Sequence, residues 1–197
     1  MKKDGKDNYK VNSMLRSLKA LFNYGIDIYD LQMKNPCTKL DFFSVVISTK
    51  YIPTDHEIEE VRNKLSVKQR ILFDFVAETG ARINEGVRFF NNPEINGDLI
   101  TLWTRKSKNS DLTPRHIPKP DMLDSIDLEE MKNEWTTYPR FLEDLNKGKW
   151  NWHSLRHRIA SKWANGGLTT LEIMNRLGHS SLKVTLNYLK LLGYTRL

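Results

Sequence analysis

The sequence contains a single cysteine, Cys37, in 197 residues. No intramolecular disulfide can form, and a metal site built from several cysteine thiolates is excluded. Long apolar runs are also missing, because no stretch approaches the roughly 20 residues that a membrane-spanning helix needs. The polar start, MKKDGKDNYK, lacks the apolar segment of a signal peptide. We therefore expect a soluble protein that stays in the cytoplasm and does not bind a membrane.

The rest of the composition is that of a globular protein with an excess of positive charge. Hydrophobic residues make up 39% of the chain, which is enough for a packed core. The chain has 31 Lys and Arg against 24 Asp and Glu, a formal net charge of +7. Such an excess favours a polyanionic partner, DNA or RNA first, although solubility alone explains it equally well.

The N-terminal quarter of the chain predicts one helix and a linker. Residues 12–34 have leucines near helical spacing, and Asn35-Pro36 should end that helix, since the residue before a proline is pushed out of the helical region. The segment up to residue 51 reads as a linker. Within it, the apolar run 42–47 is either a strand or a packed connector.

Capping signals mark the next helices. Thr54 and Glu57 have the spacing of a capping box and predict a helix through Leu65. Ser66 should cap the following helix, which Gly80 should close in a left-handed conformation. Another helix is then expected to run to about residue 90.

The middle of the chain predicts a small antiparallel sheet. Residues 99–104 favour a strand and residues 112–117 its partner, with the basic segment 105–110 as an exposed hairpin tip. Residues 121–150 look loop-like at first and helical around 138–145. With the short helices expected at the C-terminal end, the fold class is mainly α with one small antiparallel sheet (α+β).

The last 45 residues predict short helices separated by clear breaks. A helix over 153–165 buries one apolar stripe, and a second begins at the capping box of Thr169 and Glu172. Gly178 should end that second helix. The final helix carries Tyr188.

Two pairs of residues in this region suit phosphate chemistry. On a helix, His153 and Arg156 lie three apart and share a face, where a planar guanidinium and an imidazole could hold a phosphate. His179 follows a helix-ending glycine, nine residues before Tyr188. Taken singly, His153 and Arg156 are better interpreted as an ordinary exposed basic surface, and a tyrosine within a helix is usually a core residue.

Earlier in the chain, Arg82 stands at the expected start of a helix, where backbone N–H groups also favour an anion. Glu85 is three residues further on and could orient Arg82 from behind. Lys106 projects from the hairpin tip and could protonate a leaving group, or it could be a solvated lysine like its neighbour Lys108.

Together these residues describe a phosphoryl-transfer site. A tyrosine can serve as a covalent nucleophile, and arginines and histidines can neutralise charge that grows on phosphate oxygens. With so many fixed cations we expect no metal and no cofactor. The acidic residues show no cluster of the kind that a metal-dependent nuclease uses.

The ordered motifs resemble those of the tyrosine recombinases, the phage-integrase and Xer-like family. Residues 79–85, TGARINE, are similar to the first arginine motif of that family. Residues 153–157 (HSLRH), 177–181 (LGHSS) and 185–188 (TLNY) are similar to its second box. The match covers roughly residues 51–192, and order and spacing agree as well.

The resemblance implies a fold, a reaction and roles. The fold is the tyrosine recombinase catalytic domain, and Tyr188 attacks the scissile phosphate to give a 3′-phosphotyrosine and a free 5′-hydroxyl. Lys106 is the general acid and Glu85 is supporting. The residues that hold the phosphate are Arg82, Arg156, His153 and His179.

The resemblance also implies a mobile-element integrase acting on double-stranded DNA attachment sites. Such enzymes form tetramers on DNA, and we expect a monomer in isolation. Residues 1–50 resemble the end of a helical core-binding domain plus a linker, and residues 51–197 the catalytic domain. We further predict direct DNA contacts from four basic residues: Arg105, Lys108, Arg115 and Arg158.

Alternatives remain open at this point. The same phosphotyrosine chemistry supports DNA relaxation of the type IB topoisomerase kind. A non-catalytic DNA-binding or regulatory relative is a different class, but it has no need of Tyr188. Tyr194 is a reserve candidate for the nucleophile, although its position fits the motif poorly.

Overall fold

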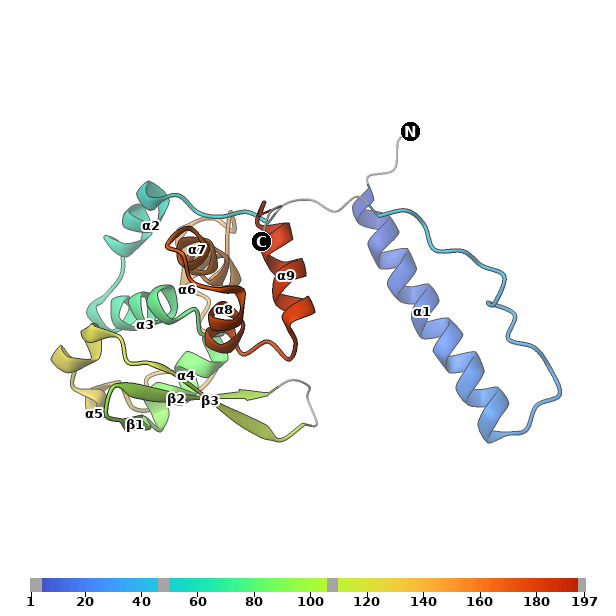
Figure 1. Ribbon diagram of the computed structural model, residues 1–197, viewed down its shortest axis with the longest axis horizontal. Helices are drawn as coiled ribbons and strands as arrows, with labels where there is room; N and C mark the ends of the chain where they lie inside the picture. Colours follow the sequence, from blue (N-terminus) through green and yellow to red (C-terminus); the bar gives the residue numbers. More distant parts are fainter. Residues whose placement is uncertain (1–4, 46–49, 106–109, 195–197) are drawn as a thin grey trace. The chain divides into compact units, whose positions relative to one another are not determined.

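The computed structural model describes residues 5–45, 50–105 and 110–194, and the chain divides into two units, Met1–Ser48 and Thr49–Leu197 (Figure 1). In the first unit, helix α1 (Gly5–Ile28) is followed by an extended segment that packs back along it. The carboxamide of Asn12 clamps that segment, because it donates to the carbonyl of Phe43 and accepts from its N–H, both at 2.8 Å.

One expectation for this unit needs correction, and the structure decides one that was left open. Helix α1 ends at Ile28 and not at Asn35-Pro36, and Asp30 adopts a positive φ of 46° just beyond it. A left-handed residue breaks the helical hydrogen bonding before the proline is reached. The described part of the apolar run 42–47 forms no strand and is a connector held by side-chain hydrogen bonds. Its remaining residues lie outside the described part of the chain.

The second unit begins with three helices: α2 (Asp55–Arg62), α3 (Val67–Thr79) and α4 (Ile83–Asn91). The capping box predicted at Thr54 is present, and Ser66 caps α3 as expected, there too with a capping box, which it forms with Gln69. Helix α2 stops at Arg62, short of the predicted Leu65. Gly80 has the expected left-handed conformation, with φ of 62°, and a Cβ there would lie 2.9 Å from the Ile159 side chain.

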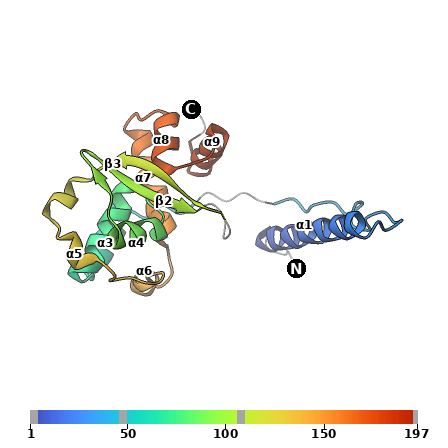
Figure 2. The ribbon, with the colours of Figure 1, turned by 90° about the horizontal axis from the view of Figure 1, so that it is seen from below.

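The sheet follows in the order β1 (Ile95–Asn96), β2 (Leu99–Arg105) and β3 (Leu112–Pro118), all antiparallel. The two long strands confirm the prediction; the short β1 was not predicted, although the Asn-Gly pair beside it is a hairpin signal. Strand β2 packs against α4, and β3 packs against α8 (Figure 2).

Short helices connect the sheet to the C-terminal helices. The segment predicted as loop-like contains a 3-10 helix, η1 (Asp121–Ser125), and α5 (Leu128–Met131), while α6 (Phe141–Leu145) covers the end of the predicted helix 138–145. The chain closes with α7 (Trp152–Asn165), α8 (Thr170–Leu177) and α9 (Leu182–Leu191), near their predicted places.

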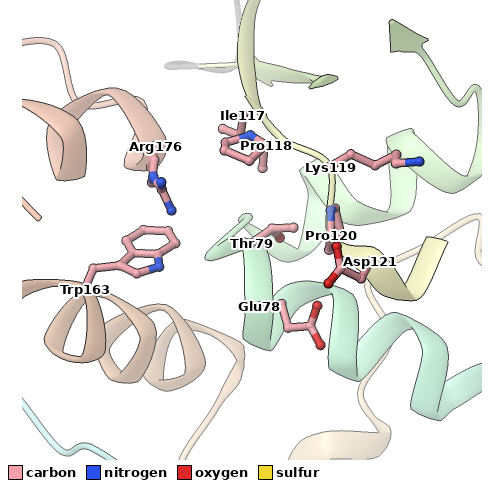
Figure 3. A pocket seen from close by; sticks show the side chains of 9 residues that line it. All are labelled: Glu78, Thr79, Ile117, Pro118, Lys119, Pro120, Asp121, Trp163 and Arg176. Atoms are coloured by element: carbon pink, nitrogen blue, oxygen red, sulfur yellow. The ribbon is translucent and has the colours of Figure 1, made fainter. Parts of the chain in front are cut away.

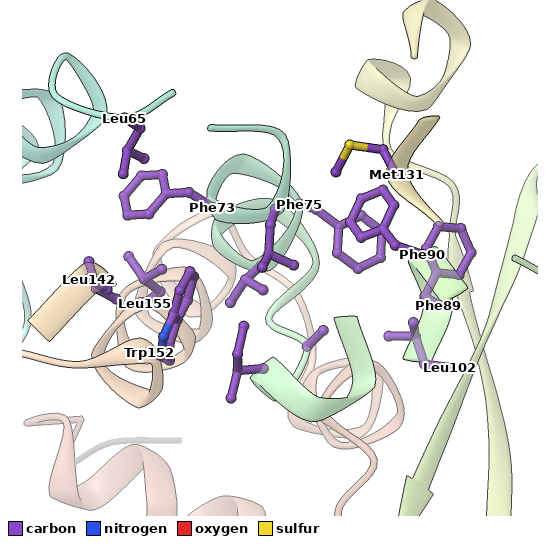
Figure 4. Close-up of a cluster of buried hydrophobic side chains, with 14 of the residues drawn as sticks. Leu65, Phe73, Phe75, Phe89, Phe90, Leu102, Met131, Leu142, Trp152 and Leu155 are labelled. Carbon is purple, nitrogen blue, oxygen red and sulfur yellow. The ribbon is translucent and has the colours of Figure 1, made fainter. Parts of the chain in front are cut away.

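Two apolar clusters hold the second unit together. The larger surrounds α3, where Phe75 stacks on Phe89 with ring centroids 4.9 Å apart and Phe73 faces Trp152 (Figure 4). The smaller joins α7, α8 and α9 and consists of Ala160, Ile173, Leu177 and Leu189. Helix α7 lies between them because Leu155 belongs to the first cluster and Ala160 to the second. Packing in both clusters fixes the position of α7, which carries His153 and Arg156.

In the described segments, none of the helices has the combination of length and apolar character that crossing a membrane requires.

Candidate active site

The centre of the site is the hydroxyl of Tyr188 on α9. It lies 2.7 Å from Nδ1 of His157, and the ring of Tyr188 is 5.2 Å from the rings of both His157 and His179. The ring of His153 is 6.5 Å from that of Tyr188 and 4.6 Å from that of His157. The structure thus brings together Tyr188, His153 and His179, which the sequence predicted as partners, and adds His157.

A glycine and a buried threonine position His179. Gly178 ends α8 with φ of 63°, and a Cβ there would lie 2.6 Å from Cδ of Arg115. The chain can make this turn only without a side chain. Nδ1 of His179 then lies 3.0 Å from the hydroxyl of Thr185, which is fully buried on α9. His179 is therefore fixed to the helix that carries Tyr188.

Arg156 is buried, with 1% of its surface exposed, so a solvated basic surface does not describe it. Its guanidinium donates to the carbonyl of Gly80 at 2.6 Å and to the carbonyl of Leu177. These carbonyls are at the ends of α3 and α8, where helices leave acceptors unpaired. Arg156 therefore satisfies two helix ends and carries a charge into the site.

Arg82 stands at the N-terminus of α4, as predicted, and Glu85 lies directly against it. The Arg82 guanidinium donates to one Glu85 oxygen at 2.8 Å, and its backbone N–H donates to the other at 2.9 Å. The hydroxyl of Thr104 on β2 accepts a further bond at 3.2 Å. The side chain of Arg82 keeps 42% of its surface exposed, so its guanidinium remains accessible to a ligand.

The prediction that Arg115 contacts DNA is wrong for this conformation. Its guanidinium is buried and donates to Glu85 at 2.6 Å and to the carbonyl of Arg176. Side chains alternate along a strand, and Arg115 lies two residues from the inward-facing Ile117. This two-residue spacing from an apolar strand residue is the feature of the sequence that could have indicated a buried Arg115. Arg115 therefore supports Glu85 from the interior of the protein.

The other predicted DNA contacts differ in how far the structure leaves them exposed. Arg105 ends β2 and is exposed, whereas Arg158 on α7 is mostly covered and pairs with Asp55. Lys106 and Lys108 lie outside the described residues. The reserve nucleophile, Tyr194, donates its hydroxyl to the carbonyl of Ser161 at 2.8 Å and shows no contact with the histidines of the site.

Burial controls the protonation of the uncharged groups. It raises the pKa of Tyr188 to about 12, against the opposing charges of Arg156 and Arg82. Burial, reinforced by neighbouring positive charge, lowers the pKa of His157 to about 3 and that of His179 to about 4. The pKa of His153 is lowered by the same causes. At neutral pH the site therefore contains a neutral phenol and three neutral imidazoles.

The charged groups give the site a positive excess. Burial and the charges of Arg82 and Arg115 lower the pKa of Arg156 to about 9, so its guanidinium stays protonated at pH 7. Glu85 is the carboxylate bound to Arg82 and Arg115. Cations held together in a poorly solvated place are stabilised by a bound anion. A phosphodiester beside Tyr188 would supply that negative charge.

A pocket of about 250 Å³ opens beside these residues. Arg82 and His153 line it together with Tyr138, Asn151 and Trp152. A different pocket, of about 240 Å³, lies where Trp163 and Arg176 face Glu78 and Asp121 (Figure 3). None of the predicted site residues lines that second pocket, so the first is the pocket of the candidate active site.

Over residues 5–45, 50–105 and 110–194, no group of three or more histidine, cysteine, aspartate or glutamate side chains is arranged to hold a metal ion.

Sequence reasoning missed two residues near the nucleophile. His157 was read only as part of the motif, although it lies four residues after His153 and so on the same helix face. Lys50 precedes α2, and its charge acts on both of these histidines. No sequence signal marks Lys50, because its proximity depends on how the chain enters the second unit.

Comparison with models of protein families and with curated proteins gives no match to this sequence. Solved structures do match. The Tn1549 transposon integrase in complex with circular intermediate DNA has a TM-score of 0.62 at 18% identity, covering 91% of this chain and 74% of that chain. A lambda integrase dimer bound to a COC′ core site gives 0.65 at 15% identity, covering 92% and 59%. The catalytic domain of bacteriophage HP1 integrase gives 0.53 at 19% identity, covering 71% and 87%.

At these identities the likeness is one of fold. The second unit has the fold of a tyrosine recombinase catalytic domain, mainly helical with a small antiparallel sheet, and the predicted fold class is confirmed.

Glu85 makes a testable contribution to acid stability. Burial alone would raise its pKa, but the charge of Arg115 and the backbone N–H and charge of Arg82 lower it to about 2, from an ordinary value of 4.5. A depressed pKa gives stability that is complete above pH 4.5 and is lost as the pH falls toward 2. We expect Glu85→Gln to lower the free energy of unfolding by about 3 kcal/mol at pH 7.

Urea unfolding between pH 7 and pH 3 checks this expectation, and the difference from wild type should shrink as the pH falls. The control is Glu129→Gln, since the side chain of Glu129 is 77% exposed and its removal should change little at any pH. A constant difference between Glu85→Gln and wild type over the whole range would contradict the assigned ion pairs.

Proposed function

We propose that this chain is the catalytic part of a site-specific DNA recombinase, an integrase that cleaves and rejoins DNA through a 3′-phosphotyrosine at Tyr188. One observation carries the proposal. The Tyr188 hydroxyl lies within a cluster of three histidines and in the field of Arg82 and Arg156, in a recombinase fold. A core tyrosine needs one hydrogen-bond partner and gains nothing from cations nearby.

In the proposed reaction, the scissile phosphate binds between Arg82 and Arg156. Their guanidinium groups, with His153 and His179, stabilise the negative charge that grows on the non-bridging oxygens as Tyr188 attacks. The pocket beside Arg82 and His153 gives the DNA backbone access to the site. Lys106 is proposed as the general acid for the departing 5′ oxygen on the basis of its motif position. Rejoining reverses these steps without an external energy source.

The proposed substrate is double-stranded DNA. The Tn1549 and lambda integrases, which share the fold, were solved in complex with DNA. The net charge of +7 suits such a partner, and the exposed Arg105 remains a proposed phosphate contact. We further propose assembly as a tetramer on paired attachment sites of a mobile element, from a monomer in isolation. Because its proposed substrate is DNA, we propose that the protein is located in the cytoplasm, with the element on which it acts.

The first unit is proposed to be the end of a helical core-binding domain plus linker. The HP1 catalytic domain alone covers 71% of this chain, whereas the longer Tn1549 and lambda integrases cover 91% and 92%. The additional coverage is comparable with the length of the unit Met1–Ser48, which supports this division.

A suicide DNA substrate tests the function. A nick placed next to the cleavage position lets a short fragment diffuse away after attack, so the covalent protein–DNA adduct accumulates. Using the attachment sequence of the element as substrate, we expect an adduct resistant to denaturation, with the nucleotide on the peptide that contains Tyr188. Relaxation of supercoiled DNA without preference for a site would indicate topoisomerase-like activity. Salt-dependent binding with no adduct would indicate a non-catalytic relative.

A further inference from the structure

Among the described residues, the hydrogen-bond partner of the Tyr188 hydroxyl is His157, a histidine that the catalytic motif leaves without a role. Nδ1 of His157 lies 2.7 Å from the phenolic oxygen, within the range of a good hydrogen bond. The ring centroid of His153 is farther from that of Tyr188, at 6.5 Å against 5.2 Å for His157. Nδ1 of His179 is already hydrogen-bonded to Thr185. Among these three histidines, His157 is the one placed to receive the phenolic proton.

We infer that His157 orients the Tyr188 nucleophile and takes up its proton during attack. This inference rests on the proposed function and assigns one further residue to it. In the tautomer that carries its proton on Nε2, Nδ1 of His157 accepts the hydrogen bond that Tyr188 donates. The other two histidines are then left to bind phosphate oxygens.

The fold fixes this pair from both sides. His157 is buried on α7, one residue after Arg156 and between the two apolar clusters that anchor this helix. On α9, the neighbour of Tyr188 is Leu189, which is fully buried in the smaller cluster. Neither helix can turn its side chain away without disturbing a core, so the hydroxyl is held ready for attack.

Cleavage transfers two protons and exchanges one bond at phosphorus. As the Tyr188 oxygen bonds to phosphorus, its proton moves to Nδ1 of His157 and the bond from phosphorus to the 5′ oxygen breaks. The 5′ oxygen takes a proton from the general acid, proposed as Lys106. In the reverse direction the 5′-hydroxyl gives its proton back to the general acid as its oxygen attacks phosphorus. The bond from phosphorus to the Tyr188 oxygen then breaks, and the imidazolium of His157 returns its proton to that oxygen.

The charges around His157 should favour uptake of the proton when DNA is bound. The groups whose charge or proximity acts on His157 are His153 and Arg156 from α7, Lys50 from the segment before α2, and Tyr188 from α9. Together with burial, the cations disfavour the imidazolium in the free protein. A bound phosphodiester adds a negative charge and favours the protonated form. The substrate would thus activate the base that its own cleavage requires.

Single-turnover cleavage of the suicide substrate at saturating DNA tests the inference with His157→Leu and His157→Asn. A general base contributes about 10²- to 10⁴-fold, and we expect His157→Leu to lose at least about 10²-fold in rate. His157→Asn keeps an acceptor near the Nδ1 position, so it should recover the orientation and part of the rate. DNA affinity and thermal stability of His157→Asn should stay near wild type.

The pH dependence separates proton uptake from a structural role. Without His157, the phenolic proton must go to hydroxide, so the rate of either variant relative to wild type should rise about tenfold per pH unit between pH 7 and pH 9. His153→Asn is the matched variant: it should lower the rate without this slope. The inference is overturned if His157→Leu cleaves like wild type, or if its deficit is the same at every pH. Failure of wild type itself to form an adduct would instead overturn the proposed function.

Discussion

Tyr188→Phe should form no covalent adduct with DNA while still binding it. The substitution removes only the phenolic oxygen, and the remaining ring keeps its contacts with His157 and His179. Thr185, which also carries a hydroxyl on α9, is hydrogen-bonded to Nδ1 of His179, so we do not expect it to replace the phenolic oxygen. The adduct is followed on denaturing gels with the nicked substrate, and binding is followed by mobility shift. We expect the amount of adduct to fall by at least about 10⁴-fold, that is, to the background of the gel assay.

Tyr194→Phe is the matched control. This variant also loses one tyrosine hydroxyl, but that hydroxyl donates to the carbonyl of Ser161. Losing such a bond should cost about 1 kcal/mol of stability and leave adduct formation intact. Full adduct from Tyr188→Phe, or loss of adduct only in Tyr194→Phe, would contradict the assignment of the nucleophile.

Arg156→Lys should lose about 10²- to 10³-fold in cleavage rate although it keeps the positive charge. A lysine ammonium cannot reproduce the planar fork that spans the carbonyls of Gly80 and Leu177 and still face a phosphate. At least one buried carbonyl is left without a donor, which should also lower the free energy of unfolding by about 2 kcal/mol. Single-turnover cleavage and urea unfolding measure the two effects separately.

Arg62→Lys controls for the loss of a guanidinium fork elsewhere. Arg62 binds both carboxylate oxygens of Asp74 between α2 and α3, partly exposed to solvent. Its replacement should cost less than about 1 kcal/mol and leave cleavage unchanged. If Arg156→Lys cleaves as fast as Arg62→Lys, then Arg156 serves the fold alone and not the phosphate.

The local signals in the sequence predicted helix ends well. The capping boxes at Thr54 and Thr169, the cap at Ser66, the left-handed Gly80 and the helix end at Gly178 all appear where the sequence placed them. These features need only neighbouring residues, since a cap is made by a side chain and a backbone N–H three residues away. The end of α1 was predicted wrongly because a left-handed Asp30 has no strong local signature.

The contents of the candidate site could be predicted from motif order, but its geometry could not. Arg156 reaches carbonyls that are 76 and 21 residues away in the sequence, and Tyr188 meets a histidine 31 residues before it. Such contacts depend on how α3, α7, α8 and α9 pack, and no local pattern encodes them. The sequence likewise predicted Arg115 as a DNA contact, whereas in the folded protein it is buried and donates to Glu85.

The sequence by itself therefore determined the class of fold, the helix boundaries set by caps, and the residue types available for phosphate chemistry. The tertiary structure alone decided which histidine contacts Tyr188 and which cations are buried. The physical reason is that hydrogen bonds in a cap are short-range along the chain. The desolvation and charge that set the pKa of Tyr188 and His157, by contrast, come from elements brought together only by packing the two apolar clusters.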